Sequence, residues 1–178
     1  MRRAVLNVVG LSARDLGSGV MPRLAARAAR GSVARVKPAF PAVTCTAQSD
    51  YLTGKPPSAH GIVGNGWYDR ALSEVQFWKQ SNRLVGAPKA WDALHARNPK
   101  LKVANLFWWY NMGTAADIAV TPRPIYKANG GKIFDIASYP QRFKTLLKRD
   151  LGEFPFHSFW GPRAGLPSTK WIADAARW

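Results

Sequence analysis

Apolar residues recur along this chain with two periods, and the alternation of the two predicts an α/β protein. Residues 4–9 form a short continuous apolar run that ends at Gly10, which is typical of a buried parallel strand. Residues 22–30 open with proline and carry apolar side chains at helical spacing. Residues 33–37 alternate apolar and basic side chains, which favours a strand with one face in water. Strand, helix and strand in this order predict a βαβ unit.

The rest of the chain continues both periods. A helix is predicted from Thr44 to Thr53, closed by Gly54, and it is followed by a loop at 61–66. Further strands are predicted at 72–78 and 102–109, an extended stretch at 121–124, and helices at 88–97, 140–151 and 167–178. We therefore expect a mostly parallel sheet sandwiched by helices, with the site at the carboxyl ends of the strands.

The size and composition indicate one globular domain over residues 1–178, with 47% hydrophobic residues. No apolar run approaches the ~20 residues of a membrane span, so we expect no membrane partner. The basic start of the chain reads as the flank of a first buried strand rather than a signal peptide, which favours a cytoplasmic location. The last predicted helix stops at Trp178 without Gly, Pro or a polar tail, as in a chain cut inside an element, although a docked terminal helix could end the same way.

The formal net charge of +16 favours anionic partners such as nucleotides, nucleic acid or anionic surfaces. The basic residues are scattered rather than gathered in a block. A second interpretation is that an acidic remainder, which would balance this charge, lies outside the chain. The sequence leaves both interpretations open.

Candidate chemistry lies at the predicted start of the helix at 44–53. Thr44 carries a hydroxyl at a helix terminus, where backbone N–H groups are unpaired and the macrodipole is positive. Such a terminus accepts a phosphate, and an alcohol there loses its proton more easily. Asn65 brings a side-chain amide on the loop that follows soon after. This arrangement suits attack on phosphorus.

The same segment resembles the type I phosphodiesterase/nucleotide pyrophosphatase family of the alkaline phosphatase superfamily. That family's pattern runs roughly P-x-x-T, a helix ending in T-G, then P-x-x-H-G-I-x-x-N, and it is matched here from Pro41 to Asn65. Bacterial members share further stretches, which are Asn65–Asp69, Phe77–Asn82, Phe107–Met112 and Thr121–Tyr126. The resemblance implies an alkaline-phosphatase-like fold, of which these residues would be the N-terminal part with an incomplete sheet.

The resemblance also implies roles for individual residues. Thr44 matches the threonine that attacks the phosphate, and its distance from the Thr-Gly pair excludes Thr46. Asn65 matches the amide that donates to a phosphate oxygen. Without the family motif, the spacing favours Thr44 as a helix cap, and Asn65 has a second interpretation as a turn residue. Trp67 and Tyr68 are candidate substrate-binding residues that could stack on a nucleobase, or else pack into a core.

The family holds divalent metal, typically zinc, through Asp and His ligands. Here Val9 stands at the position of the first aspartate ligand, and valine cannot bind a metal. Asn7 offers only an amide oxygen nearby. The three histidines show no ligand spacing, and the ligands of the family's second half have no counterpart. The sequence therefore predicts no metal site within these residues.

Three functions follow from these observations. The first is a phosphodiesterase or nucleotide pyrophosphatase fragment that acts on phosphate esters through a threonine nucleophile. Its metal-binding half would lie in a missing C-terminal part or a second polypeptide, and exposed apolar surface would favour self-association. The second is a non-catalytic remnant that binds phosphate or nucleotides. The third is a basic nucleic-acid-binding module built on 26 Lys and Arg with eight Trp.

Overall fold

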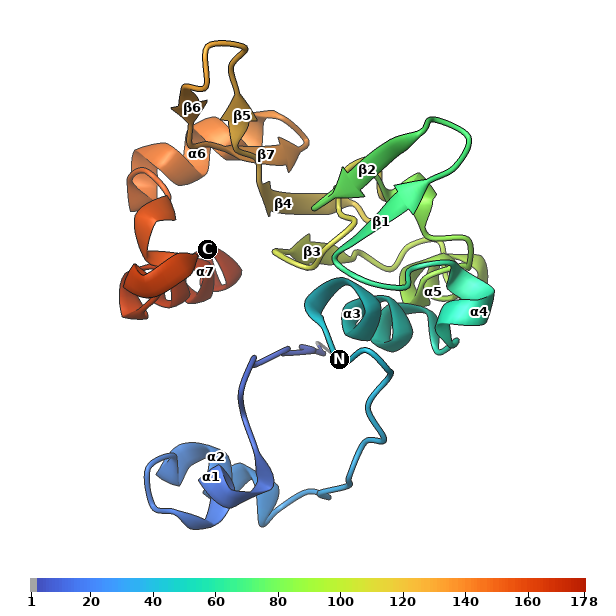
Figure 1. The fold of residues 1–178 in the computed structure, drawn as a ribbon. Coiled ribbons are helices and arrows are strands. Elements are labelled where there is room, and N and C mark those ends of the chain that lie inside the picture. The colour runs from blue at the N-terminus through green and yellow to red at the C-terminus, as the bar shows by residue number, and fades with distance from the viewer. Residues whose placement is uncertain (1–2) are drawn as a thin grey trace. The chain divides into compact units, whose positions relative to one another are not determined.

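A computed structural model describes residues 3–178. The chain divides into two compact units, and the boundary between them in the sequence falls between Lys37 and Pro38. Figure 1 labels the elements of each unit along the chain. None of the helices that residues 3–178 form combines the length and the apolar character needed to cross a bilayer.

The first unit, residues 3–37, contains two short helices, α1 (Ala13–Gly17) and α2 (Pro22–Ala28). The Ser12 N–H donates to the Asp15 carboxylate at 2.6 Å and thereby starts α1. This bond holds the pKa of Asp15 below its usual value. Helix α2 confirms the prediction of a helix that opens at Pro22.

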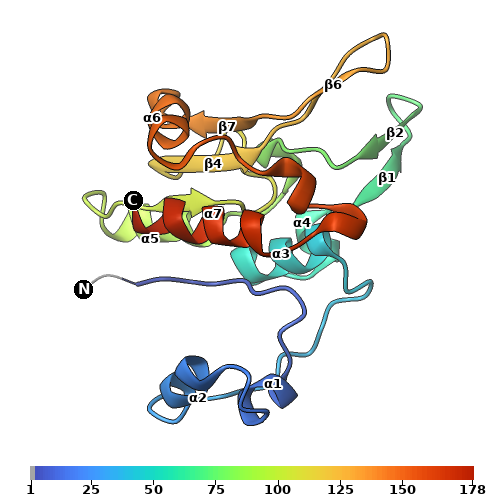
Figure 2. The ribbon, with the colours of Figure 1, turned by 90° about the vertical axis from the view of Figure 1, so that its left-hand side faces the viewer.

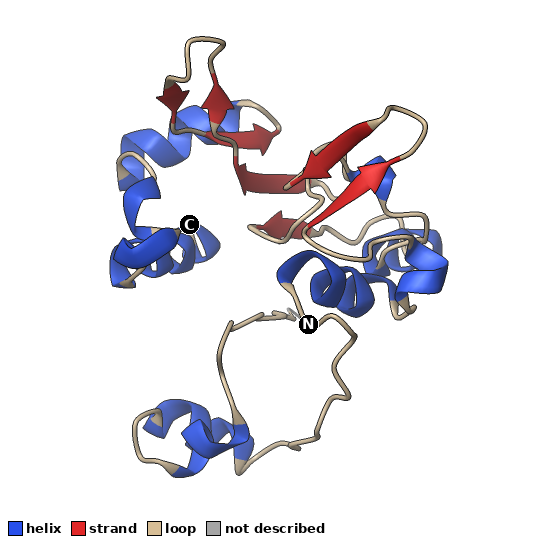
Figure 3. Cartoon of the chain, viewed as in Figure 1, coloured by secondary structure: helices blue, strands red, loops and turns tan. Residues whose placement is uncertain are grey.

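The two strands predicted in this unit are wrong. Residues 4–9 and 33–37 carry no strand and are drawn as loop in Figure 3. The side chains of Val5 and Val9 are 77% and 83% exposed. A strand needs a neighbour for its N–H and C=O groups, and the two short helices of this unit offer none. The apolar character of residues 4–9 was therefore not sufficient to form a strand.

The second unit, residues 38–178, opens with α3 (Thr44–Thr53), whose bounds match the predicted helix. Gly54 ends it in the left-handed region, at φ 64°, and donates its N–H to the Asp50 carbonyl at 2.8 Å. The short helix α4 (Pro57–His60) follows. The hairpin of β1 (Gly66–Asp69) and β2 (Glu74–Phe77) comes next.

The largest sheet of the described residues has the strand order β3-β4-β7. Strands β3 (Ala104–Leu106) and β4 (Ile118–Pro122) are parallel, whereas β7 (Ile136–Tyr139) is antiparallel to β4. A second hairpin, of β5 (Ile125–Tyr126) and β6 (Lys132–Ile133), lies between β4 and β7 in the chain. The protein is thus mixed α/β, but the expectation of a mostly parallel sheet is wrong for these residues. The predicted N-terminal strands do not form, and the connection from β4 to β7 is short enough to reverse the chain.

The remaining predicted helices are confirmed near their expected positions. They are α5 (Ala90–Arg97), α6 (Arg142–Leu151) and α7 (Leu166–Arg177), and single turns of 3₁₀ helix lie at Asn82–Leu84, Phe156–Ser158 and Gly161–Arg163. Helix α6 packs on β7, and α7 packs against α6 (Figure 2).

Two apolar clusters hold the second unit together. The first joins the sheet to α6 and α7 and contains Val120, Ile136, Leu147, Phe154, Phe156, Trp171 and Ala175. The second, which we call the α3 cluster, contains Cys45, Ile62, Val85, Trp109 and Tyr110. The α3 cluster fixes the helix that carries Thr44 against the loops that surround it.

Candidate functional site

Thr44 is the first residue of α3, and Val43 is the N-cap. The first helical bond runs from the Ala47 N–H to the Val43 carbonyl at 2.9 Å, so the three preceding N–H groups have no acceptor within the helix. Within residues 3–178 the Thr44 hydroxyl makes no side-chain hydrogen bond. Thr44 is half-buried at this terminus rather than acting as its cap.

Asn65 meets the same terminus from 20 residues further along the chain. Its Oδ1 accepts the Cys45 N–H at 3.0 Å. Because only the oxygen of a side-chain amide can accept a hydrogen bond, this contact fixes the orientation of the amide and leaves its NH₂ group as the free donor. The structure therefore brings the Asn65 amide to the residue next to Thr44.

The two aromatic candidates on β1 differ in their surroundings. Trp67 is partly buried and packs against the α3 cluster. Tyr68 is 60% exposed, because successive side chains of a strand point to opposite faces. The structure brings Trp67, but not Tyr68, to the cluster that supports Thr44.

Gln48 is a positioning residue that the sequence did not reveal. It is buried on α3, and its Oε1 accepts the Trp109 N–H at 2.6 Å. The loop around Trp109 is strained, since Phe107 and Tyr110 adopt φ of 60° and 53°. The amide of Asn82 donates to the Tyr110 carbonyl at 3.0 Å. A strained aromatic loop is thus tied to the helix that carries Thr44, and only its FWWYNM motif hinted at this.

Cys45 and Thr46 are buried beside Thr44 and offer no competing nucleophile. Burial raises the pKa of the Cys45 thiol to about 12, so it stays protonated at neutral pH. Thr46 is fully buried, and its hydroxyl has no partner within the described part of the chain. The thiol is a packing group of the α3 cluster.

His60 joins the far end of α3 to the loop that leads to Asn65. Its Nδ1 accepts the Ile62 N–H at 3.0 Å, which leaves the proton on Nε2, 2.6 Å from Asp50 Oδ1. The imidazole is fully buried. This geometry gives His60 a structural role, because both ring nitrogens are engaged by protein groups.

Comparison with known proteins identifies the class to which this fold and site belong. The sequence matches the family described as type I phosphodiesterase / nucleotide pyrophosphatase over residues 4–177. The chain belongs to this family of phosphodiesterase/pyrophosphatase-type hydrolases.

A particular relative is the bovine (Bos taurus) ectonucleotide pyrophosphatase/phosphodiesterase family member 3. It is 30% identical over 119 residues, which cover 64% of this chain and 12% of the bovine protein. The match therefore spans a small part of that relative. No solved structure shows a significant match.

The family is generally metal-dependent, but the side chains that the structure describes do not form a donor set that fits a metal. Within residues 3–178 no three His, Cys, Asp or Glu side chains gather. His95 lies 3.1 Å from the Asp117 carboxylate, whose other oxygen accepts from Lys102 at 2.7 Å. The hydrogen bond from Lys102 is the main reason that the pKa of Asp117 is lowered to about 2. The carboxylate of Asp117 is therefore already engaged by protein partners.

Proposed function

We propose that this chain carries the nucleophile of a phosphodiesterase- or nucleotide pyrophosphatase-type hydrolase, with Thr44 as that nucleophile. The observation that supports it is the hydrogen bond from the Cys45 N–H to Asn65 Oδ1, which holds the amide beside Thr44. The free NH₂ of Asn65 and the unpaired N–H groups of α3 are the donors for the oxygens of a phosphate ester.

The proposed step is an in-line displacement at phosphorus. The Thr44 Oγ1–P bond forms as the bond from phosphorus to the leaving oxygen breaks, and the threonine proton passes to solvent base. Asn65 donates to a non-bridging oxygen while negative charge grows on it. Water then releases the phosphoryl group from Thr44. No part of this step is assigned to a metal, because the described residues hold no group that fits one.

A matched pair of variants tests the role of Thr44. Thr44→Val and Thr46→Val each replace a hydroxyl by a methyl of the same shape, two residues apart in the first turn of α3. We expect Thr44→Val to abolish turnover of the p-nitrophenyl ester of thymidine monophosphate in the presence of added zinc. Thr46→Val should leave turnover unchanged, since its buried hydroxyl has no partner in the described residues. Equal rates in the two variants would remove Thr44 from the mechanism.

A nucleotidyl adduct gives a second readout. Peptide mass spectrometry after substrate is added should find the thymidylyl group on the peptide that contains Thr44, and Asn65→Ala should reduce its amount. An adduct on another residue would contradict the assignment.

A non-catalytic phosphate- or nucleotide-binding role is the second candidate, and the unsuitable metal donor set favours it. AMP should then bind without hydrolysis, more weakly at high salt, and lose affinity in Asn65→Ala. Binding that does not respond to salt or to Asn65→Ala would exclude this candidate.

A further inference from the structure

A surface cleft of about 350 Å³ lies away from the motif residues described above. One side comes from the β5–β6 hairpin and the residue that follows it, and the other from the 3₁₀ turns between α6 and α7 (Figure 1 labels β5, β6, α6 and α7). It is lined by Tyr126, Lys132, Phe134, Phe156, His157, Trp160, Pro162 and Arg163. The volume lies within the range of small-molecule sites.

Aromatic rings dominate this cleft and remain exposed. Tyr126, Phe134 and Trp160 are 67%, 39% and 38% exposed, respectively. Phe134 is fixed by stacking on the buried ring of Phe156, with 4.8 Å between centroids. Trp160 packs edge to face with the same Phe156 ring, with 5.2 Å between the ring centroids. Rigid aromatic faces that meet water at the mouth of a cleft are suited to stack on a planar group.

Two cations accompany the rings. Lys132 pairs with Tyr126 across the β5–β6 ladder, and its Nζ lies 5.7 Å from the centre of that ring. Arg163 enters from the opposite side of the cleft. Neither side chain forms an ion pair within residues 3–178. The cleft therefore holds positive charge that no carboxylate of the described residues neutralises.

We infer that this cleft binds a small aromatic anion, with the ring stacked on Tyr126, Phe134 or Trp160 and the charge facing Lys132 and Arg163. The inference is independent of Thr44. An elongated nucleic acid is less suitable, because the basic residues do not continue as a track along the sequence.

The test uses 2-naphthalenesulfonate, which has no phosphorus for Thr44 to attack. Two matched probes each remove one property: 2-naphthol is neutral, and cyclohexanesulfonate is not aromatic. Isothermal titration should show binding of 2-naphthalenesulfonate at least about tenfold tighter than either matched probe, as expected for the loss of one charged or stacking contact. Equal binding of all three probes, or no binding at millimolar concentration, would overturn the proposal.

Variants locate the site. Tyr126→Ala and Arg163→Gln should each weaken 2-naphthalenesulfonate by roughly five- to tenfold. Tyr126 is 67% exposed, so its removal should leave the fold intact, and circular dichroism of the variant checks this. Arg97→Gln, an exposed cation outside the cleft, and Thr44→Val should bind like wild type. If oligo-dT binds through these residues more tightly than the sulfonate, or if Tyr126→Ala and Arg163→Gln change nothing, the assignment is wrong.

Discussion

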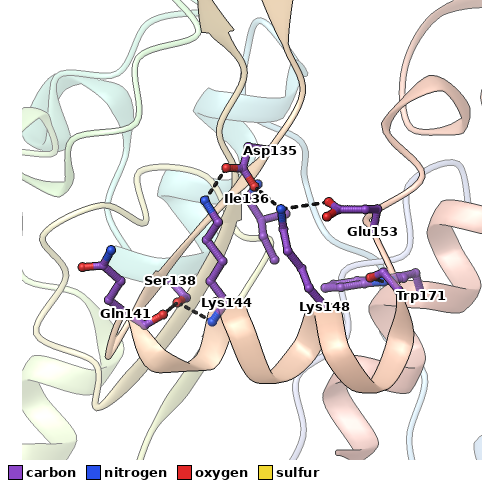
Figure 4. A network of polar contacts seen from close by, with 9 residues as sticks. Asp135, Ile136, Ser138, Gln141, Lys144, Lys148, Glu153 and Trp171 are labelled. Atoms are coloured by element: carbon purple, nitrogen blue, oxygen red, sulfur yellow. Dashed lines mark hydrogen bonds and ion pairs between the residues drawn. The ribbon is translucent and has the colours of Figure 1, made fainter.

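Asp135 should stabilise the second unit far more than a neighbouring carboxylate that shares one of its lysines. Figure 4 shows Asp135 between Lys144 and Lys148 of α6, with Glu153 on the other side of Lys148. The Asp135 side chain is 16% exposed, and Glu153 is 72% exposed. Lys148 Nζ lies 3.0 Å from Asp135 and 2.8 Å from Glu153, so distance alone does not distinguish the two pairs.

The expected magnitudes follow from burial and from the number of donors. Asp135 accepts from both lysines and from the Ile136 N–H at 2.8 Å. Asn at this position keeps one carbonyl oxygen and loses the charge, so Asp135→Asn should lower the free energy of unfolding by about 1–3 kcal/mol. Glu153→Gln should cost about 0–1 kcal/mol, because water already solvates that carboxylate.

The pH dependence provides the sharper test. Burial disfavours the charged form of Asp135, but hydrogen bonds from Lys144 and Lys148 outweigh it, so its pKa lies below the usual 3.8. A lowered carboxylate pKa gives stability that is present above the unfolded value and lost as the pH falls through the folded value. The difference between wild type and Asp135→Asn should therefore be full at pH 7 and shrink below pH 3.8.

Urea unfolding followed by circular dichroism measures both variants, and a double-mutant cycle with Lys148→Met isolates each pair. We expect a coupling of about 1 kcal/mol or more for Asp135 with Lys148, and under about 0.5 kcal/mol for Glu153 with Lys148. Equal costs for Asp135→Asn and Glu153→Gln at pH 7 would refute the reasoning. So would a penalty for Asp135→Asn that persists undiminished at pH 2.

Three further predictions concern the core and the site. Leu147→Ala should lower the free energy of unfolding in urea by about 2–5 kcal/mol, because Leu147 is 1% exposed between the sheet and α7. A similar loss in the exposed variant Leu166→Ala would contradict this reasoning. Asn65→Ala should cost about 1 kcal/mol through the lost acceptor for the Cys45 N–H, and Asn65→Asp should cost less because it keeps an oxygen there. The Cys45 thiol, with a pKa of about 12, should resist iodoacetamide at pH 8 until urea unfolds the chain, and rapid alkylation of the native protein would disprove its burial.

Local signals predicted the five longer helices of the described residues well, whereas the short helices α1 and α4 were not predicted. Gly54 and Gly152 mark the ends of α3 and α6, and Pro22 marks the start of α2. Each of these residues acts on the backbone at its own position, through a positive φ or a missing N–H, so no distant partner is needed to interpret it. That is why the predicted and observed bounds of α3 coincide.

Strands were predicted less well, because a strand exists only through its neighbours. Residues 4–9 are as apolar as a buried strand, yet they lack a paired edge and remain exposed. Residues 102–109 have a similar pattern, and there Ala104–Leu106 pair with β4 as β3. The difference lies in contacts that no periodicity encodes. The direction of β7 likewise depends on how the chain returns from the β5–β6 hairpin.

In the candidate site, too, the local feature was predicted from the sequence and the contact between distant residues was not. The motif placed Thr44 at a helix terminus, and in the structure it is the first residue of α3, after the N-cap Val43. No sequence pattern indicated that Gln48, a polar residue in a helix, would be buried and would accept the N–H of Trp109, 61 residues away. Polar residues on a helix normally face water, so a buried one is visible only when its partner is known. Gln48 lies on α3 and accepts the backbone N–H of Trp109, whereas Asn65 lies on a loop and accepts the backbone N–H of Cys45 on α3. These two bonds hold the strained 107–110 loop and the loop at residue 65 against one helix. The arrangement around Thr44 therefore depends on amide contacts between distant segments rather than on the helix that carries it.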